Sequence, residues 1–418
     1  MIDLSAERSE LAAQLAHWRA ATLAFDDLES FAAEWAWSSL EQYLGMTLRS
    51  YLAGVVDRLR EAADTLAADV AKAQDEQQLA MLRRRVLAFK QRVLQSETVL
   101  DFYGDAVNTR TSPRQAALLT ACDLLAAQSM TAALRPLGHA APPVLTYVDK
   151  GAGASVLRAG LRLWDAGAPS PVAAIKVVRH SLLLPTSLLH ESGHQVAHIT
   201  GWTAELGQAL TAELGATGPA SAWTEWVSEV AADVFAFAHI GYAAVAGLQQ
   251  VISGGSAAVF RYPVGDPHPI PYLRILFGTT LCRTTYGAGP WDDLTATWVR
   301  NYPLDHAPDA VREVVEASMP LLPRLAELCL LAPQRAFGGR SLVALVDPTT
   351  VRPEALTALE FEVQQGKDRS VHWSWLECVR LLALAGWRVA TTPRRAQDYA
   401  AKHEDWMLRI GGSARQSA

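Results

Sequence analysis

The sequence has few cysteines, no excess of basic residues and no pair of residues that suggests a redox centre. Its formal net charge is −6 and its pI is near 6.0, which leaves no basic surface for nucleic acid. Short basic runs such as Arg83–Arg85 fit a solvated helix face. The four cysteines are too far apart for zinc or redox pairs, so we expect buried free thiols. These are Cys122, Cys282, Cys329 and Cys378.

Segments that would direct the chain to a membrane are also scarce. The first residues lack a basic start followed by an apolar core, so we expect no signal peptide. The most apolar long stretch, residues 234–252, contains His239, Gln249 and Gln250. This stretch favours a buried helix over a membrane span. We therefore expect a cytoplasmic protein with no membrane partner.

The residues that are abundant are helix formers. Hydrophobic residues make up 50% of the 418 residues and charged residues 19%, which is typical of a folded chain with more than one packed unit. We predict a mainly α (α+β) fold. Residues 1–138 should form a helical N-terminal domain, residues 139–290 a second domain with a small sheet, and residues 291–418 a helical C-terminal region. We expect the last residues, 411–418, to be frayed.

Strand patterns are confined to one part of the chain. Residues 144–148, 155–163 and 172–178 read as short strands separated by glycine and proline. A helix should follow, beginning near Pro185 with Thr186 or Ser187 as its cap and ending near Gly201. Within the N-terminal helices, residues 101–113 should break the helical pattern. We expect that polar segment to serve packing or capping rather than to line a cleft.

The predicted helix carries the motif His190-Glu191-Ser192-Gly193-His194. Positions four apart lie on one face of a helix, one turn apart, so both imidazoles can reach the same metal ion. Glu191 directly follows His190, one step further round the helix. From there its carboxylate can face a water on the metal without itself being a metal ligand. This is the arrangement of zinc metallopeptidase helices.

A second segment places Glu229 and Asp233 four apart on a strongly apolar helix. Two carboxylates on one helix face repel each other, and burying them without partners is costly. A cation shared with the histidine helix would remove both problems. Glu229 would then be the third ligand, and Asp233 could accept the free ring N–H of a ligating histidine.

The pair of segments resembles the gluzincin clan of metallopeptidases, of which thermolysin is the familiar member. The resemblance covers residues 142–280 at most, and it implies that residues 139–290 form a zincin-like catalytic domain. Carried over by position, it implies that His190, His194 and Glu229 bind one Zn²⁺ ion. Glu191 matches the catalytic base, and Asp233 matches the aspartate behind the ligands.

The resemblance implies a hydrolase, most simply a metallopeptidase that cleaves peptide bonds by Glu191-assisted attack of zinc-bound water. An oxyanion also needs a donor from the protein. His268, in a proline-flanked loop, is the candidate for this catalytic role, and the alternative is a purely structural loop. Tyr262, Tyr272 and Arg274 are further candidates for substrate binding. We expect the substrate to be a peptide or a small amide.

Three alternatives remain at the level of sequence. His198 follows His194 by one more turn, but it lies about 12 Å along the helix axis from His190, too far to share one ion. A zinc hydrolase of a non-peptide amide or ester would use the same residues. A non-catalytic regulatory or interaction protein on a gluzincin scaffold would need the metal ligands but not Glu191.

Overall fold

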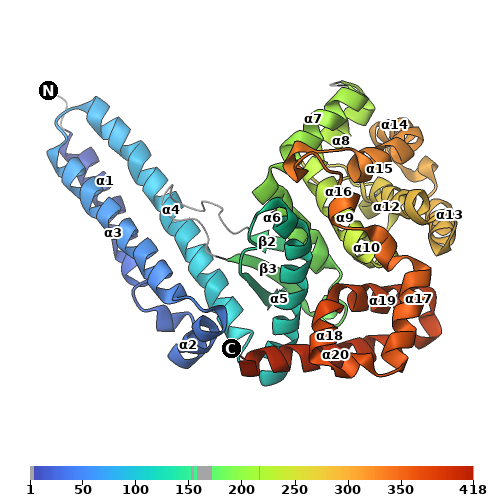
Figure 1. The fold of residues 1–418 in the computed structure, drawn as a ribbon. Coiled ribbons are helices and arrows are strands. Elements are labelled where there is room, and N and C mark those ends of the chain that lie inside the picture. The colour runs from blue at the N-terminus through green and yellow to red at the C-terminus, as the bar shows by residue number, and fades with distance from the viewer. Residues whose placement is uncertain (1–3, 152–154, 158–171, 216, 418) are drawn as a thin grey trace. The chain divides into compact units, whose positions relative to one another are not determined.

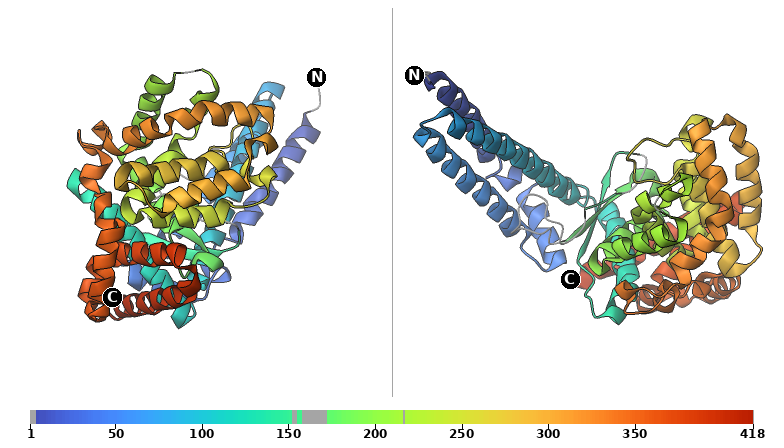
Figure 2. Two further views of the ribbon diagram at one scale, coloured as in Figure 1. Left: turned by 90° about the vertical axis from the view of Figure 1, so that its right-hand side faces the viewer. Right: turned by 90° about the horizontal axis from the view of Figure 1, so that it is seen from above.

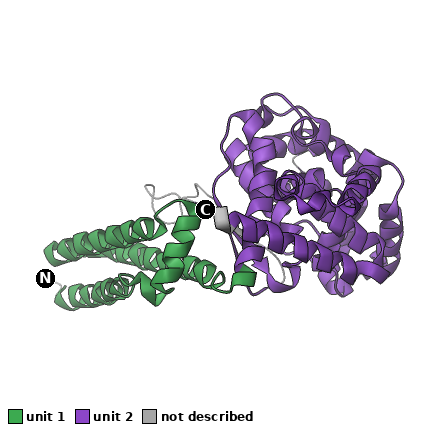
Figure 3. Ribbon diagram, turned by 60° about the horizontal axis from the view of Figure 1, so that its bottom comes forward, with its two compact units in different colours: residues 1–115, 160–170, 418 green, residues 116–159, 171–417 purple. Residues whose placement is uncertain are grey.

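The computed structural model describes residues 4–151, 155–157, 172–215 and 217–417. The chain divides into two compact units (Figure 3). Described residues 4–115 make up the first unit, and the described part of residues 116–417 makes up the second. Helices dominate both units, as the composition predicts.

The first unit is built on three long helices that pack against one another side by side (Figures 1 and 2). Each buries an apolar stripe, for example Leu52, Val55 and Leu59 at helical spacing. The helices of this unit are α1 (Ser5–Leu23), α2 (Glu34–Leu44), α3 (Leu48–Lys72) and α4 (Glu76–Asn108).

The predicted break at residues 101–113 is wrong for most of its length, because α4 continues to Asn108. Tyr103 and Ala106 are fully buried on the inner face of this turn, and burial of that face outweighs the weak helix preference of its polar residues. The Asn108 side chain donates a hydrogen bond to the Phe31 carbonyl at 2.8 Å. This segment therefore has a packing role within the first unit.

The division between the units falls inside the first turn of α5 (Pro113–Leu134), not at residue 138. This helix is buried on most sides, so it belongs to the core of the second unit. Asp123 ties it to the sheet by accepting hydrogen bonds from the backbone N–H of Thr146 at 2.6 Å and from its hydroxyl at 2.7 Å. No division falls at residue 290, so the predicted second domain and C-terminal region lie in one unit.

Within the described part of the chain, one helical segment, residues 113–137, is long and apolar enough to cross a membrane. However, 72% of its most apolar window is buried inside the structure. A buried core helix meets the same criteria of length and composition, so this finding is weak evidence for a span.

The described residues form one three-stranded sheet in the order β1-β3-β2. β1 (Val144–Asp149) pairs in parallel with β3 (Ala173–Val178), and β2 (Ser155–Leu157) pairs with β3 in the antiparallel direction. β1 and β3 are apolar and almost wholly buried, as expected of strands covered on both faces. The predicted strands at residues 144–148 and 172–178 are thus confirmed. Of the predicted strand 155–163, residues 158–163 lie outside the described residues.

Helices fill the rest of the second unit, and α6 (Ser187–Thr200) follows the sheet (Figure 1). It ends next to Gly201, as predicted, and the φ of 73° at this C-cap suits glycine. The predicted side-chain cap is wrong, because Thr186 makes no capping hydrogen bond. The helices are α6 (Ser187–Thr200), α7 (Trp202–Leu214), α8 (Ala222–Glu225), α9 (Val227–Ile240), α10 (Tyr242–Ile252), α11 (Ser256–Val259), α12 (Pro271–Tyr286), α13 (Pro290–Asn301), α14 (Asp309–Ser318), α15 (Leu322–Leu331), α16 (Leu342–Leu345), α17 (Pro353–Gln364), α18 (Val371–Leu376), α19 (Cys378–Thr391) and α20 (Ala396–Ser417).

The C-terminal end is not frayed over the residues that the structure describes. α20 extends to Ser417, and Gly411 packs so closely on α5 that a Cβ there would collide with the backbone of Ala117. The four cysteines are buried and free, as predicted.

Candidate metal centre

α6 and α9 cross in close contact, and a glycine makes this approach possible. A Cβ added to Gly193 would lie 2.9 Å from Ala232 Cα and 2.9 Å from Phe235 Cβ. Real Cβ atoms do not approach other carbons this closely, so any larger residue would push the two helices apart. The glycine inside the histidine motif therefore sets how near α9 comes to the two histidines.

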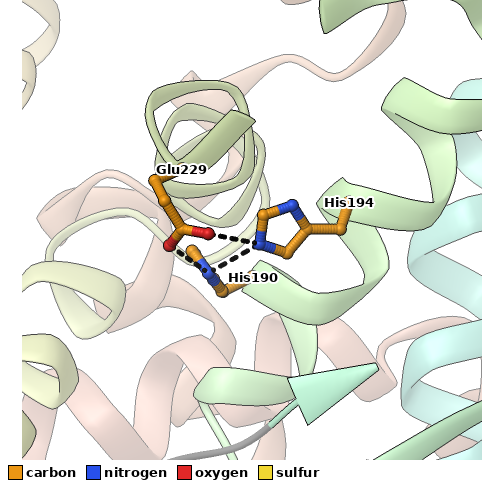
Figure 4. Close-up of side chains that lie close together, drawn as sticks. All are labelled: His190, His194 and Glu229. Carbon is orange, nitrogen blue, oxygen red and sulfur yellow. Dashed lines mark hydrogen bonds and ion pairs between the residues drawn. The ribbon is translucent and has the colours of Figure 1, made fainter. Parts of the chain in front are cut away.

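His190 and His194 on α6 and Glu229 on α9 point toward one another (Figure 4). The two Nε2 atoms lie 3.1 Å apart. His190 Nε2 is 3.3 Å from Glu229 Oε2, and His194 Nε2 is 3.1 Å from Glu229 Oε1. One ligand atom from each residue thus falls within 4.8 Å of the others. Two imidazole nitrogens and one carboxylate oxygen are a donor set that suits zinc.

The other ring nitrogen of each histidine also has a neighbour. His190 Nδ1 lies 2.8 Å from Asp233 Oδ1, one turn along α9 from Glu229. His194 Nδ1 lies 3.2 Å from the hydroxyl of Ser228. Partners of this kind hold the ring orientation and the tautomer that leaves Nε2 free to bind a metal. Asp233 therefore lies beside the His190 ring as the sequence predicts, in an ion-pair contact whose geometry is not that of a hydrogen bond. Ser228 is a residue that the sequence analysis missed.

Arg274 on α12 completes a buried charge cluster. Its Nε lies 2.6 Å from Asp233 Oδ2, and an Nη atom lies 3.2 Å from Glu229 Oε2. Burial alone would lower the pKa of Arg274, but these carboxylates raise it. The sequence analysis assigned this residue to substrate binding. The structure instead commits its guanidinium to the carboxylates of α9.

The carboxylates of α9 outnumber the fixed positive charge beside them. Glu229 and Asp233 are held ionised and carry two negative charges, and Arg274 carries one positive charge. With neutral histidines a net negative charge remains, which is expensive in a buried site. A cation bound between the histidines and Glu229 would compensate it, so the residues present fit such an ion in charge as well as in donor type.

The neighbouring carboxylates also favour the charged form of His190. Burial alone would lower the pKa of His190, but hydrogen bonds and charges from Asp233 and Glu229 raise it to about 10. Burial would raise the pKa of Glu229, yet His190 and His194 hold it well below the usual range. The site therefore favours positive charge at His190 and negative charge at Glu229, so its electrostatic potential suits a bound cation.

Glu191 lies beside the cluster without belonging to it. Its side chain is buried and lines the same cavity as the three ligands. Burial raises the pKa of Glu191, and the neighbouring His190 and His194 oppose that shift only partly. A carboxyl group with a raised pKa exchanges protons near neutral pH more readily than an exposed one, which suits a general base.

His268 reaches the edge of the cluster from the loop before α12. Its Nε2 lies 3.7 Å from Glu229 Oε2, while its Nδ1 lies 2.6 Å from Asp266 Oδ1. Asp266 also receives a hydrogen bond from Arg261 at 2.8 Å. Burial alone would raise the pKa of Asp266, but hydrogen bonds from His268 and Arg261 lower it to about 2. Asp266 therefore stays ionised and orients the His268 ring toward the site.

A cavity of about 590 Å³ opens in front of the cluster. Its lining combines the polar side chains described above with apolar side chains of α9, α10 and α12. The polar ones include His190, Glu191, His194, Glu229, Asp233, His268 and Arg274, and the apolar ones include Phe237, Val245, Leu248, Val251, Phe277 and Leu281. A lining of this composition suits a molecule that has both polar and apolar groups.

Two predicted site residues do not reach this cavity. Tyr272 is 1% exposed and its ring packs on Phe260. Tyr262 packs edge-on against Trp226, and neither tyrosine is among the residues that line the cavity. Both belong to the apolar packing around α12, because their rings bury more area there than at a polar site. His198 is exposed and lies outside the ligand group.

The sequence analysis missed two residues that contact the histidines of the site, Ser228 and Asp266, for different reasons. Ser228 precedes Glu229, and only the direction of its side chain toward His194 gives it a role. Asp266 lies two residues before His268, and that short spacing is a signal that could have been read from the sequence. A carboxylate at this distance from a loop histidine often orients the ring.

Comparisons with models of protein families, with curated proteins and with solved structures found no match for this chain. The resemblance to gluzincins therefore depends on the residues of α6 and α9 and on their arrangement.

Proposed function

We propose that this protein is a zinc-dependent hydrolase of the gluzincin type that cleaves peptide bonds. The observation that carries the proposal is the convergence of His190, His194 and Glu229 within 4.8 Å, beside the buried carboxyl group of Glu191. In this proposal the sheet, α6 and α9 make up a zincin-like domain, with His190, His194 and Glu229 as the ligands of one Zn²⁺ ion.

The ion, when bound, would supply Lewis acidity and would bring the pKa of a water in the site toward neutrality. Proton transfer and the orientation of the histidine rings belong to side chains of the protein. Glu191 accepts a proton at its carboxylate and later delivers it to the leaving amine. Asp233 and Ser228 hold the rings of His190 and His194 by their Nδ1 atoms.

His268 is the donor in this proposal. Its Nδ1 is paired with Asp266, so Nε2 is the nitrogen that faces a substrate oxygen, and it donates to that oxygen as an imidazolium, with a proton on both ring nitrogens. More than half of its side chain is exposed, at 55%, which leaves room for a substrate to reach it. A hydrogen bond aimed at a developing oxyanion stabilises the transition state more than the ground state.

The size of the cavity favours a small substrate. A volume of about 590 Å³ is in the range of pockets for small molecules and short peptides. A non-peptide amide or ester of similar size is the second candidate, because it would meet the same polar groups. A non-catalytic scaffold is disfavoured by Glu191, since metal binding alone does not need a buried carboxyl group beside the ligands.

The proposal is tested by metal analysis combined with cleavage of a mixed library of short peptides. We expect about one equivalent of zinc per chain, loss of cleavage on treatment with a strong chelator, and recovery on adding zinc. Simple amides and esters assayed in parallel distinguish the second candidate. Bound zinc without turnover of any of these substrates would contradict a hydrolase, and absence of zinc from the folded chain would contradict the metal site.

Replacing His268 by alanine should lower kcat/KM for a peptide substrate about 10²–10³-fold, because one oxyanion donor is lost. Zinc content should stay unchanged, since His268 is not in the ligand group. Kinetics and metal analysis on the same preparation measure both. His306→Ala, at an exposed histidine of the same unit, is the control. Equal turnover of the two variants would remove His268 from the mechanism.

A further inference from the structure

One wall of the cavity in front of the metal centre belongs to a helix without charge. Helix α10 (Tyr242–Ile252) contains no acidic or basic residue. It contributes more of the lining residues than α6, α9 or α12 does. These are Ala244, Val245, Gly247, Leu248, Gln250, Val251 and Ile252. The wall that α10 provides is therefore apolar surface with one amide.

Part of this wall is not covered by other side chains of the protein. Ala244, Leu248 and Val251 follow one another at spacings of four and three residues, so they lie on one face of α10. Ala244 and Leu248 are half-buried, and Val251 is 38% exposed. All three line the cavity, so an apolar group inside it can cover this face and remove it from water.

Close contacts with glycine fix α10 beside the helix that carries the histidines. A Cβ added to Gly247 would collide with the side chain of Thr186. Thr186 directly precedes α6, and His190 follows it by about 6 Å along the helix axis. On the other side, a Cβ added to Gly278 of α12 would lie 3.0 Å from a side-chain carbon of α10. Leu248 is therefore held next to the start of the histidine helix.

Among the described residues that line the cavity, all ionisable side chains but one lie in the candidate metal centre. Arg274 is paired there with Glu229 and Asp233. The lining residues that follow it on α12 are apolar, and Leu281 lies about 10 Å further along the axis. The exception is His180, which is exposed. An ionised group placed against α10 would thus lose hydration without gaining a partner on that helix.

We propose that α10 determines the specificity of the candidate active site. It selects substrates in which a residue next to the scissile bond has an uncharged, apolar side chain, and this side chain packs on Ala244, Leu248 and Val251. The inference rests on the proposed function, because it concerns the same site. It adds the class of substrate and gives a role to three residues that take no part in the chemistry.

The test compares peptides that differ only at one residue next to the scissile bond, which is leucine, aspartate or lysine. Mass spectrometry of a digested peptide library first identifies the bond that is cut. The wild-type chain should cleave the leucine peptide with a kcat/KM about 10²-fold above that of either charged peptide. Equal values, or preference for a charged peptide, would overturn this inference and leave the hydrolase proposal standing. Cleavage of no peptide would overturn both.

Charge variants assign the preference to α10. Leu248→Lys and Val251→Lys place an ammonium group in the wall, so each should lower the leucine-to-aspartate ratio of kcat/KM about 10-fold. Val251 is already exposed, so its variant should fold even where Leu248→Lys does not. A purely structural effect would lower both rates and leave the ratio unchanged.

The matched control is Gln249→Lys, which adds the same charge to α10 at a residue that does not line the cavity. It should keep the wild-type ratio. Thermal melting and zinc content identify the folded variants. A wild-type ratio in folded Val251→Lys, or an equal change of the ratio in Gln249→Lys, would refute the role of α10.

Discussion

Replacing Glu191 by glutamine is expected to lower kcat for peptide cleavage by about 10²–10⁴-fold while the chain keeps its zinc. The amide has nearly the same shape as the carboxyl group but cannot take a proton from water. Glu191 is buried in the wall of the cavity. Arg274 forms its ion pairs with Glu229 and Asp233, so it does not need an ionised Glu191 as a partner. The substitution should therefore change the chemistry more than the packing.

The measurement combines steady-state kinetics with metal analysis and thermal melting. Removal of a buried negative charge should leave the fold intact or slightly more stable, because burial already raises the pKa of Glu191. A variant with full activity would exclude Glu191 as the base. A variant that loses zinc along with activity would show instead that Glu191 belongs to the metal site.

Replacing Glu229 by alanine should reduce bound zinc from about one equivalent to a small fraction and abolish cleavage. Glu229 provides the carboxylate that faces both histidine Nε2 atoms, at 3.3 and 3.1 Å. Two imidazoles alone bind zinc far less tightly than a complete set of three ligands. The variant also removes one of the two carboxylates that neutralise Arg274, although Asp233 still pairs with that guanidinium.

The matched control is Glu225→Ala, an exposed glutamate one turn earlier in the chain. It should retain zinc, activity and melting temperature. Dialysis against zinc buffers of known free concentration gives the affinity of each variant, and circular dichroism shows whether the chain is folded. Wild-type zinc affinity in folded Glu229→Ala would refute the ligand assignment and, with it, the proposed function.

The helical part of the site was predictable because it depends on local geometry. An α-helix places residues four apart on one face, so His190 pairs with His194, and Glu229 aligns with Asp233, before any tertiary contact forms. The strands at residues 144–149 and 173–178 were predictable for a similar reason, since a short apolar run bounded by glycine and proline has few other structures available.

The errors concern segments whose structure depends on distant partners. For Arg274 the sequence did not indicate its ionic partners: it lines the cavity, and its guanidinium pairs with Asp233 of α9, 41 residues earlier in the chain. Tyr262 and Tyr272 pack on Trp226 and Phe260. No local pattern distinguishes a tyrosine that will line a cavity from one that will fill a core.

The sequence by itself determined which functional groups share a helix, namely two imidazoles and a carboxyl group on one helix and two carboxylates on one face of another, because helical periodicity is a property of the local backbone. Only the tertiary structure decided how near these helices come, through Gly193 at their crossing, and which ionic partners surround the ligands. It also placed α5 in the second unit and set α10 against the cavity of the metal centre. Those features depend on packing between segments far apart in the chain, which no short stretch of sequence encodes.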